Sequence, residues 1–175
     1  MKTNAEKFQT FLKLCSILLI AALALLFAYT QGFRINLSDS LPHRIYRISK
    51  ITDKPITRGD YAVVDYSMIT HHSAIEAALE RKYLNRIPML KQVGAIPGDV
   101  VTLRGNLIYI NGKETGEMVV LSEDSLGNPF SAYPTPVTLQ SVQYWLISNP
   151  ERGFDSRYFG PVSRDCITHT AYPVW

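Results

Sequence analysis

The pattern of hydrophobic and polar positions divides the chain into one long apolar run and a series of short alternating segments. The run extends from Leu14 to Tyr29 without a charged residue. With Phe11 and Leu12 added, and with Lys13 reaching back to the lipid headgroups, it comes to about 19 residues, and a helix of that length spans a hydrocarbon core of about 30 Å. We therefore expect a single transmembrane helix near the N-terminus.

The charges around this run predict which way it crosses the membrane. The first 30 residues hold three lysines against Glu6, and a basic N-terminal flank stays in the cytoplasm. Residues 1–30 are then a cytoplasmic N-terminus and membrane anchor, and residues 31–175 are one extracytoplasmic domain. In a Gram-negative bacterium, the membrane is the inner membrane and the domain is periplasmic. A cleavable leader is the alternative, because Ala22-Leu23-Ala24 has the small residues of a cleavage site, but the apolar run continues past it.

After the run, short stretches rich in β-branched and aromatic residues alternate with turn residues. The turns include Pro97-Gly98 and Asn111-Gly112, and the second is the strongest short signal for a β-hairpin. From His72 to Leu84, apolar residues instead recur at i, i+3 and i+4, which predicts one helix. The predicted fold is mainly β: a transmembrane helix and then an antiparallel β domain with a short helical insertion. We expect the strands at 44–48, 61–65, 89–93, 100–103, 107–110 and 143–148.

Composition narrows the classes of function. The chain is 46% hydrophobic, which is enough for a packed core, and its net charge is +3. Beyond residue 30, 15 basic residues face 14 acidic ones, so the domain has no nucleic-acid-binding footprint. Cys15 lies in the apolar run and Cys166 near the C-terminus, which does not favour a disulfide. No metal-ligand spacing is present, and we expect neither a metal nor an organic cofactor.

Two residues far apart in sequence have the chemistry of a nucleophile and its base. Ser40 follows the apolar run, and a serine attacks only once a base removes its proton. Lys91 stands among Met89, Leu90 and Val93, and burial in such a setting lowers the pKa of a lysine from its usual value of about 10.4. A solvated surface lysine is the alternative. None of the histidines has a setting typical of a catalytic triad; they are His43, His71, His72 and His169.

Three segments carry a resemblance when taken in order. They are Ser40 after the span, then Lys91-Gln92-Val93-Gly94-Ala95-Ile96-Pro97-Gly98-Asp99, then Asp155-Ser156-Arg157-Tyr158-Phe159-Gly160. This order resembles the signal peptidase I (S26) family of membrane-anchored Ser/Lys proteases, in which the lysine heads a Lys-x-Val-x-x-x-Pro-Gly-Asp stretch. The resemblance implies a β domain of signal peptidase type and a serine endopeptidase that acts at the membrane surface.

Within that family the chain is most similar to the TraF-type peptidases of conjugal transfer systems. Their nucleophile segment reads roughly Asn-x-Ser/Thr-x-Ser-x-Pro-x-Gly-x-Tyr. The positions that match are Asn36, Ser38, Ser40, Pro42 and Tyr46. Arg44 replaces the glycine, and we expect this departure to alter the loop or an adjoining subsite. The resemblance implies maturation of a conjugative pilin, either by hydrolysis or by joining the new end to another end to give a cyclic product.

The resemblance also implies roles for individual residues. Ser40 is the nucleophile, and Lys91 is the general base. The oxyanion is bound by the backbone N–H of Ser40 and by the hydroxyl of Ser38, for which local turn bonding is the alternative. Three residues brace the site without acting chemically: Asp155, Ser156 and Arg157.

One position departs from the pattern of the family at the site itself. Many relatives have a serine two residues before the aspartate that opens the third segment, which is Asp155 here, and that serine helps to orient the lysine. This chain has Gly153 there. Ser148, Ser156 or water is left to take over that task, and the sequence does not choose among them.

The sequence leaves three functions open. The first is a membrane-anchored serine endopeptidase that cleaves exported precursors, with a pilin maturase preferred over a general signal peptidase. The second is a non-catalytic scaffold of a conjugation or secretion apparatus, motivated by Arg44 and Gly153. The third is a secreted β domain with a cleaved leader. The expected partners are a precursor or pilin substrate, the lipid bilayer and other proteins of the conjugation apparatus, and no nucleic acid.

Overall fold

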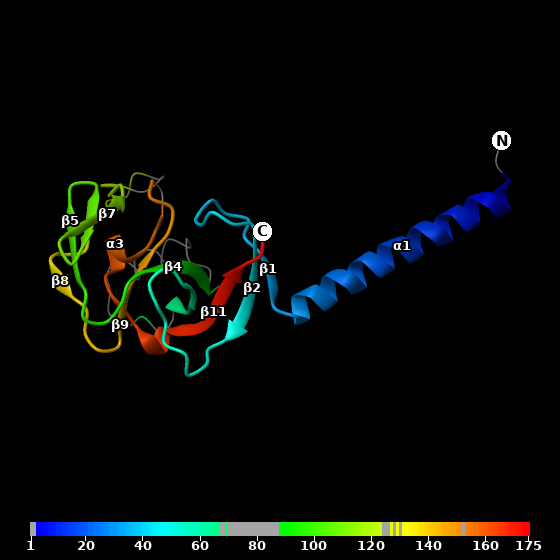
Figure 1. Ribbon diagram of the computed structural model, residues 1–175. Coiled ribbons are helices and arrows are strands. Elements are labelled where there is room, and N and C mark those ends of the chain that lie inside the picture. Colours follow the sequence, from blue (N-terminus) through cyan, green and yellow to red (C-terminus); the bar gives the residue numbers. More distant parts are fainter. Residues whose placement is uncertain are drawn as a thin grey trace.

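The computed structural model describes residues 3–66, 69, 88–123, 127, 129, 131–151 and 153–175. One long helix precedes a mainly antiparallel β domain, as the sequence predicted (Figure 1). The helices are α1 (Asn4–Thr30), α3 (Ser156–Phe159) and the 3₁₀ helix η2 (Arg164–Cys166). The strands are β1 (Phe33–Ile35), β2 (Ile45–Lys50), β3 (Tyr61–Val64), β4 (Met89–Ala95), β5 (Val100–Arg104), β6 (Leu107–Ile110), β7 (Lys113–Glu117), β8 (Val137–Thr138), β9 (Gln143–Ile147), β10 (Val162–Ser163) and β11 (Ile167–Pro173). The helix predicted from His72 to Leu84 lies outside the described residues.

Helix α1 contains the whole apolar run and begins earlier than the run does. Thr3 and Glu6 form a capping box, in which each side chain accepts a hydrogen bond from the backbone N–H of the other residue, so the polar first turn is helical as well. None of the residues of α1 is buried, and the helix stands apart from the β domain (Figure 1). It is long and apolar enough to cross a membrane.

A tight joint connects α1 to the β domain. Gly32 has a φ of 89°, in the left-handed region that favours glycine, and a Cβ at this position would overlap the carbonyl oxygen of Ile48 on β2. Beside the joint, the guanidinium of Arg34 lies 3.7 Å from the ring centroid of Tyr29 and donates a hydrogen bond to the carbonyl of that residue. The direction in which α1 leaves the domain is therefore set by specific contacts.

Two antiparallel sheets form the domain. The larger has the strand order β1-β2-β11-β3-β4-β9-β10, and the smaller has the order β7-β6-β5-β8. Strands occur at each of the six predicted places, with ends that differ by a few residues. The sequence analysis missed β11, which pairs with both β2 and β3 and so lies in the interior of the larger sheet. The hairpin predicted at Asn111-Gly112 joins β6 to β7, and both residues have positive φ, at 54° and 78°.

Strands β4 and β9 separate two hydrophobic clusters. On β9, Leu146 faces one cluster and Trp145 faces the other, because successive side chains of a strand point to opposite sides. On β4, the register shifts between Val93 and Ala95, so these two residues also face different clusters although they are two apart. The shift turns β4 at Gly94, just beyond the segment that carries the predicted lysine.

Candidate active site

Asn36 organises the loop between β1 and β2 that carries the predicted nucleophile. Its backbone N–H donates to the carbonyl of Arg44 at 2.7 Å, which closes the loop. Its side-chain amide donates to the carbonyls of His43 and Leu41, at 3.2 and 3.4 Å, and its oxygen accepts the backbone N–H of Ser38 at 3.2 Å. An asparagine suits this position because one side chain supplies both donors and an acceptor. The sequence motif included Asn36 but assigned it no role.

Ser38 and Ser40 lie side by side in this loop, with their hydroxyl oxygens 2.6 Å apart. The hydroxyl of Ser38 donates its single proton to Asn36 Oδ1 at 2.8 Å, so Ser40 is the donor in the bond between the two serines. Ser38 thus makes the local turn bond that the sequence left as the alternative to oxyanion binding. Its hydroxyl must rotate away from Asn36 before it can face an oxyanion.

Lys91 is buried on β4, with 3% of its surface exposed. It pairs with Ala62 of β3 and faces the same side as Val93, because residues two apart on a strand share a face. Burial lowers the pKa of Lys91 to about 8, against the opposing effect of the Asp155 carboxylate and with a smaller contribution from the Arg157 guanidinium. The solvated surface lysine that the sequence left open is therefore wrong.

Asp155 and Arg157 form a completely buried ion pair at the start of α3. The Arg157 guanidinium donates to both carboxylate oxygens of Asp155, from Nε at 2.8 Å and from Nη2 at 2.9 Å. Ser156 is buried as well, and its hydroxyl accepts the backbone N–H of Leu146 at 2.9 Å, which joins α3 to β9. The remaining guanidinium bonds go to the backbone carbonyls of Val119, Asn149, Pro150 and Gly153. The segment after β7 and the stretch from Asn149 to Asp155 therefore meet at one side chain.

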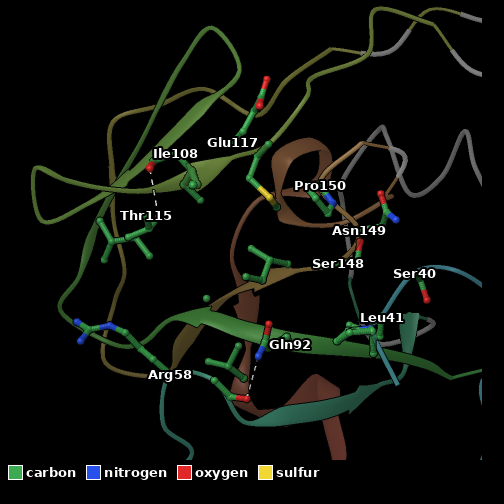
Figure 2. Close-up of a pocket in the computed structure, with 18 of the residues that line it drawn as sticks. Ser40, Leu41, Arg58, Gln92, Ile108, Thr115, Glu117, Ser148, Asn149 and Pro150 are labelled. Carbon is green, nitrogen blue, oxygen red and sulfur yellow. Dashed lines mark hydrogen bonds between the residues drawn. The ribbon is translucent and has the colours of Figure 1, made fainter. Parts of the chain in front are cut away.

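A cavity of about 980 Å³ lies between the two sheets. Figure 2 shows Ile108, Thr115 and Glu117 of the smaller sheet on one side of it and Gln92 of β4 on the other. The loop between β1 and β2 contributes residues 39–42 to the wall of the cavity, and the segment after β9 contributes residues 148–150. Ser40 therefore opens onto a space large enough for an extended peptide segment.

The segment after β9 joins the two groups of predicted site residues. The side-chain amide of Asn149 donates to the carbonyl of Asp39 at 2.9 Å, next to Ser40. The β4–β9 register, continued by one residue, puts Ser148 opposite Lys91. The serines of the loop and the buried group around Lys91 thus approach the same segment from two sides. The sequence missed the role of Asn149, although the Asn149-Pro150 dipeptide does signal a turn.

Arg44, the departure from the expected glycine, flanks the predicted nucleophile. Its guanidinium pairs with the carboxylate of Asp39 at 2.9 Å, with 54% and 84% of the two side chains exposed, and both residues line the cavity. An ion pair this exposed contributes little to stability. Its consequence is local, since it puts a cation and an anion on the cavity wall beside Ser40.

Two of the four histidines lie in the described part of the chain and make ordinary contacts there. The ring of His43 packs edge-on against Tyr46 and Tyr61, with centroids 6.0 and 6.4 Å apart. His169 is on β11, where its Nδ1 is 3.1 Å from the hydroxyl of Thr168. His71 and His72 lie outside the described residues. Lys91 therefore has the more unusual environment of the candidate bases.

The chain matches one family model and several known proteins. The family model described as "Signal peptidase, peptidase S26" matches residues 8–175. A "Conjugal transfer protein TraF" from Agrobacterium fabrum is 28% identical over 151 residues, or 82% of each chain, and a "Plasmid transfer protein TraF" from Escherichia coli is 30% identical over 156 residues, or 84% of this chain and 85% of that one. The match to the crystal structure of a signal peptidase I from Enterococcus faecalis covers 66% of this chain and 96% of that one, with a TM-score of 0.41 and 22% identity.

Proposed function

Because the chain belongs to the signal peptidase S26 family, we propose that it is a membrane-anchored serine endopeptidase with Ser40 as nucleophile and Lys91 as general base. The observation that carries the proposal is the burial of Lys91, which lowers its pKa to about 8. At that pKa a useful fraction of the amine is neutral near physiological pH, as a base requires. The residue opposite Lys91, Ser148, lines the same cavity as Ser40 and so supports a meeting of the two groups.

The proposed reaction begins with attack of Ser40 Oγ on the scissile carbonyl carbon while its proton passes to Lys91 Nζ. Ser40 first exchanges its hydrogen bond to Ser38 for one to the lysine. The backbone N–H of Ser40, with the hydroxyl of Ser38 turned away from Asn36, stabilises the oxyanion. As the intermediate collapses, Lys91 returns the proton to the leaving amine, and an ester remains on Ser40. Water then hydrolyses the ester, or an amine attacks it and two ends are joined.

The relatives named for conjugal and plasmid transfer support a place in conjugation. We propose that the substrate is a conjugative pilin precursor, exported across the inner membrane and met by the domain at the periplasmic surface. The length and hydropathy of α1 support the anchoring, and the lysines before it support the orientation. The cavity between the sheets gives an extended segment of such a precursor a place to lie.

Intact-mass spectrometry of the cognate pilin precursor tests this proposal. The precursor is co-expressed with the wild-type chain, Ser40→Ala, Lys91→Ala or Lys91→Arg, and Lys54→Ala serves as an exposed-lysine control. We expect the wild type and the control to shorten the precursor and the other three to leave it intact, since a guanidinium stays protonated and cannot replace the amine. A product lighter than the linear one by a molecule of water indicates end-joining.

Processing by Ser40→Ala or Lys91→Ala would disprove the dyad. If the wild type itself leaves the precursor intact, the non-catalytic scaffold becomes the better explanation. One observation favours that second function: the Ser40 hydroxyl is engaged with Ser38 in this structure. A scaffold predicts that pilus assembly survives Ser40→Ala but fails when residues 31–175 are deleted, and a plasmid-transfer assay separates the two.

A further inference from the structure

Ser148 has a buried hydroxyl at the point where β9 ends and the cavity begins, with 9% of the residue exposed. Its backbone N–H and its hydroxyl both donate to Asp155 Oδ2, each at 2.9 Å. The same residue thus binds one carboxylate oxygen with two donors. Hydrogen bonds to an ionised carboxylate are about twice as strong as bonds between neutral groups.

Gly153 is required for this arrangement because of space. Its φ is not in the left-handed region, so no backbone conformation demands glycine there. A Cβ at position 153 would instead overlap the hydroxyl of Ser148 and would lie 2.6 Å from the carbonyl oxygen of Asn149 and 2.7 Å from Arg157 Nη2. The hydroxyl of Ser148 therefore occupies the space that any side chain at position 153 would need.

The carboxylate that Ser148 binds acts on the proposed base. Among the described residues, the charged groups that influence Lys91 are Asp155, which raises its pKa, and Arg157, which lowers it. Tyr66 is a further titratable group that Asp155 influences: burial, and then the charge of Asp155, hold the pKa of its hydroxyl well above the usual value, so it is neutral. Ser156 is already used elsewhere, because its hydroxyl accepts a backbone N–H from β9.

We propose that Ser148, which lies opposite Lys91 when the β4–β9 register is continued by one residue, is the positioning residue of that lysine: with its hydroxyl in the space left free by Gly153, it fixes the Asp155 carboxylate whose charge acts on the lysine, and partly neutralises it. The inference rests on the proposed function of Lys91 as the base. Ser148 acts through Asp155 and does not touch the reacting atoms. Its removal leaves Asp155 Oδ2 with fewer donors, and the carboxylate then holds the lysine proton more strongly.

The test uses the full chain in detergent micelles, labelled with ¹³Cε-lysine. The Lys91 resonance is identified by its loss in Lys91→Ala, and its shift is followed with pH in the wild type and in Ser148→Ala. We expect the pKa of Lys91 to be higher in Ser148→Ala. For a rise of about one pKa unit, the neutral fraction of the amine near pH 7 falls roughly tenfold, and processing of the precursor should fall with it. Processing should recover as the pH is raised.

Two matched serine variants separate positioning from folding. Ser141→Ala removes an exposed hydroxyl before β9 and should change nothing, whereas Ser156→Ala removes a buried one and should lower the Tm without moving the pKa of Lys91. Ser148→Thr keeps the hydroxyl and should titrate like the wild type. If Ser148→Ala fails to fold, Ser148→Cys decides the question: it keeps a side chain of similar size with only a weak S–H donor, so the pKa of Lys91 should rise in this variant as well.

An unchanged pKa of Lys91 in Ser148→Ala, with processing reduced equally at every pH, overturns the inference and leaves Ser148 a structural residue. The same holds if Ser148→Thr titrates differently from the wild type. The NMR titration does not depend on a substrate. If Lys91→Ala processes the precursor normally, the proposed function fails, and the titration still decides whether Ser148 sets the pKa of the lysine.

Discussion

At the scale of a single residue, the burial of Lys91 has opposite effects on chemistry and on stability. A lysine in the unfolded chain has a pKa of about 10.4, whereas burial lowers that of Lys91 to about 8. Between these values the unfolded chain binds more protons than the folded one, so the contribution of this residue to stability rises with pH. Below pH 8 the folded protein contains a buried ammonium group. The burial that favours the neutral amine therefore also weakens the fold.

The first prediction at this scale concerns the pH dependence of activity. If neutral Lys91 is the base, kcat/KM for precursor processing should rise as the pH passes through about 8 and then level off, because the neutral amine is the active form. Initial rates on a purified precursor between pH 6 and pH 10 measure this. A flat profile over that range would mean that the titrating group is not part of the reaction.

The second prediction concerns stability. Lys91→Met keeps an unbranched side chain of similar length and removes the buried charge, so we expect no processing but a higher Tm at pH 7. The gain in the free energy of unfolding should be on the order of 3 kcal/mol at most. The gain should shrink as the pH approaches 10, where the wild-type lysine is neutral in both states. Thermal unfolding at the two pH values checks this, with Lys54→Met as the exposed control.

The burial of Lys91 could be predicted from its apolar neighbours, because side chains on a strand alternate and Val93 is on the same face. The hydrogen bond from the Ser38 hydroxyl to Asn36 could not be predicted. Where a hydroxyl points depends on the nearest acceptor, and here that acceptor is the side chain of Asn36, whose position is fixed by backbone bonds across the whole loop. A motif records which residues are present but not which of their bonds are already made.

At the scale of elements, the site depends on contacts between segments whose sequences show no clear hydrophobic periodicity. Strands with clean alternation or a hairpin turn were predicted, including β4, β6 and β9. Strand β11 was not, because Ile167–Pro173 mixes threonine, histidine and proline and lacks regular hydrophobic alternation. It becomes a strand through pairing on both sides, which is a property of the assembled sheet.

The contact between Asn149 and the loop that carries Ser40 gives a third prediction. Asn149→Ala removes the hydrogen bond to the Asp39 carbonyl, so the loop that carries Ser40 should be held less firmly. We expect kcat to fall several-fold with little change in KM, since a net hydrogen bond is worth about 1 kcal/mol. Steady-state kinetics measure this, and Asn106→Ala on the outer hairpin is the control. A change in KM alone would place the effect in substrate binding.

At the scale of the whole molecule, α1 and the β domain are joined by few contacts and share no buried residue. The boundary expected from the sequence, residues 1–30 and 31–175, stays a prediction. A transmembrane helix can be predicted from a long apolar run without any tertiary information, because its length and hydropathy need only suit the hydrocarbon core of the bilayer. The contact between the loop that carries Ser40 and the segment after β9 is different, since it depends on how β4 and β9 pair and on the hydrogen bond of Asn149 to Asp39.

The independence of α1 leads to a fourth prediction. Removal of residues 3–30 should leave the Tm of the β domain nearly unchanged while the protein moves from the membrane fraction to the soluble one. Differential scanning calorimetry and membrane flotation measure the two effects. In cells with the full chain, protease added to spheroplasts should digest the domain. Protection of the domain until lysis would contradict the proposed periplasmic orientation.

The overlap between Ser148 and a side chain at position 153 also restricts how this site can change over generations. A serine introduced at position 153 alone collides with the hydroxyl of Ser148, and loss of that hydroxyl alone leaves Asp155 with one donor fewer. Both single-step intermediates are impaired, so the two positions are epistatic. A mutational scan that changes one residue at a time would rank both as intolerant. A second arrangement of the same site needs paired substitutions together with a shift of the Asn149 carbonyl, which would lie 2.6 Å from the new Cβ.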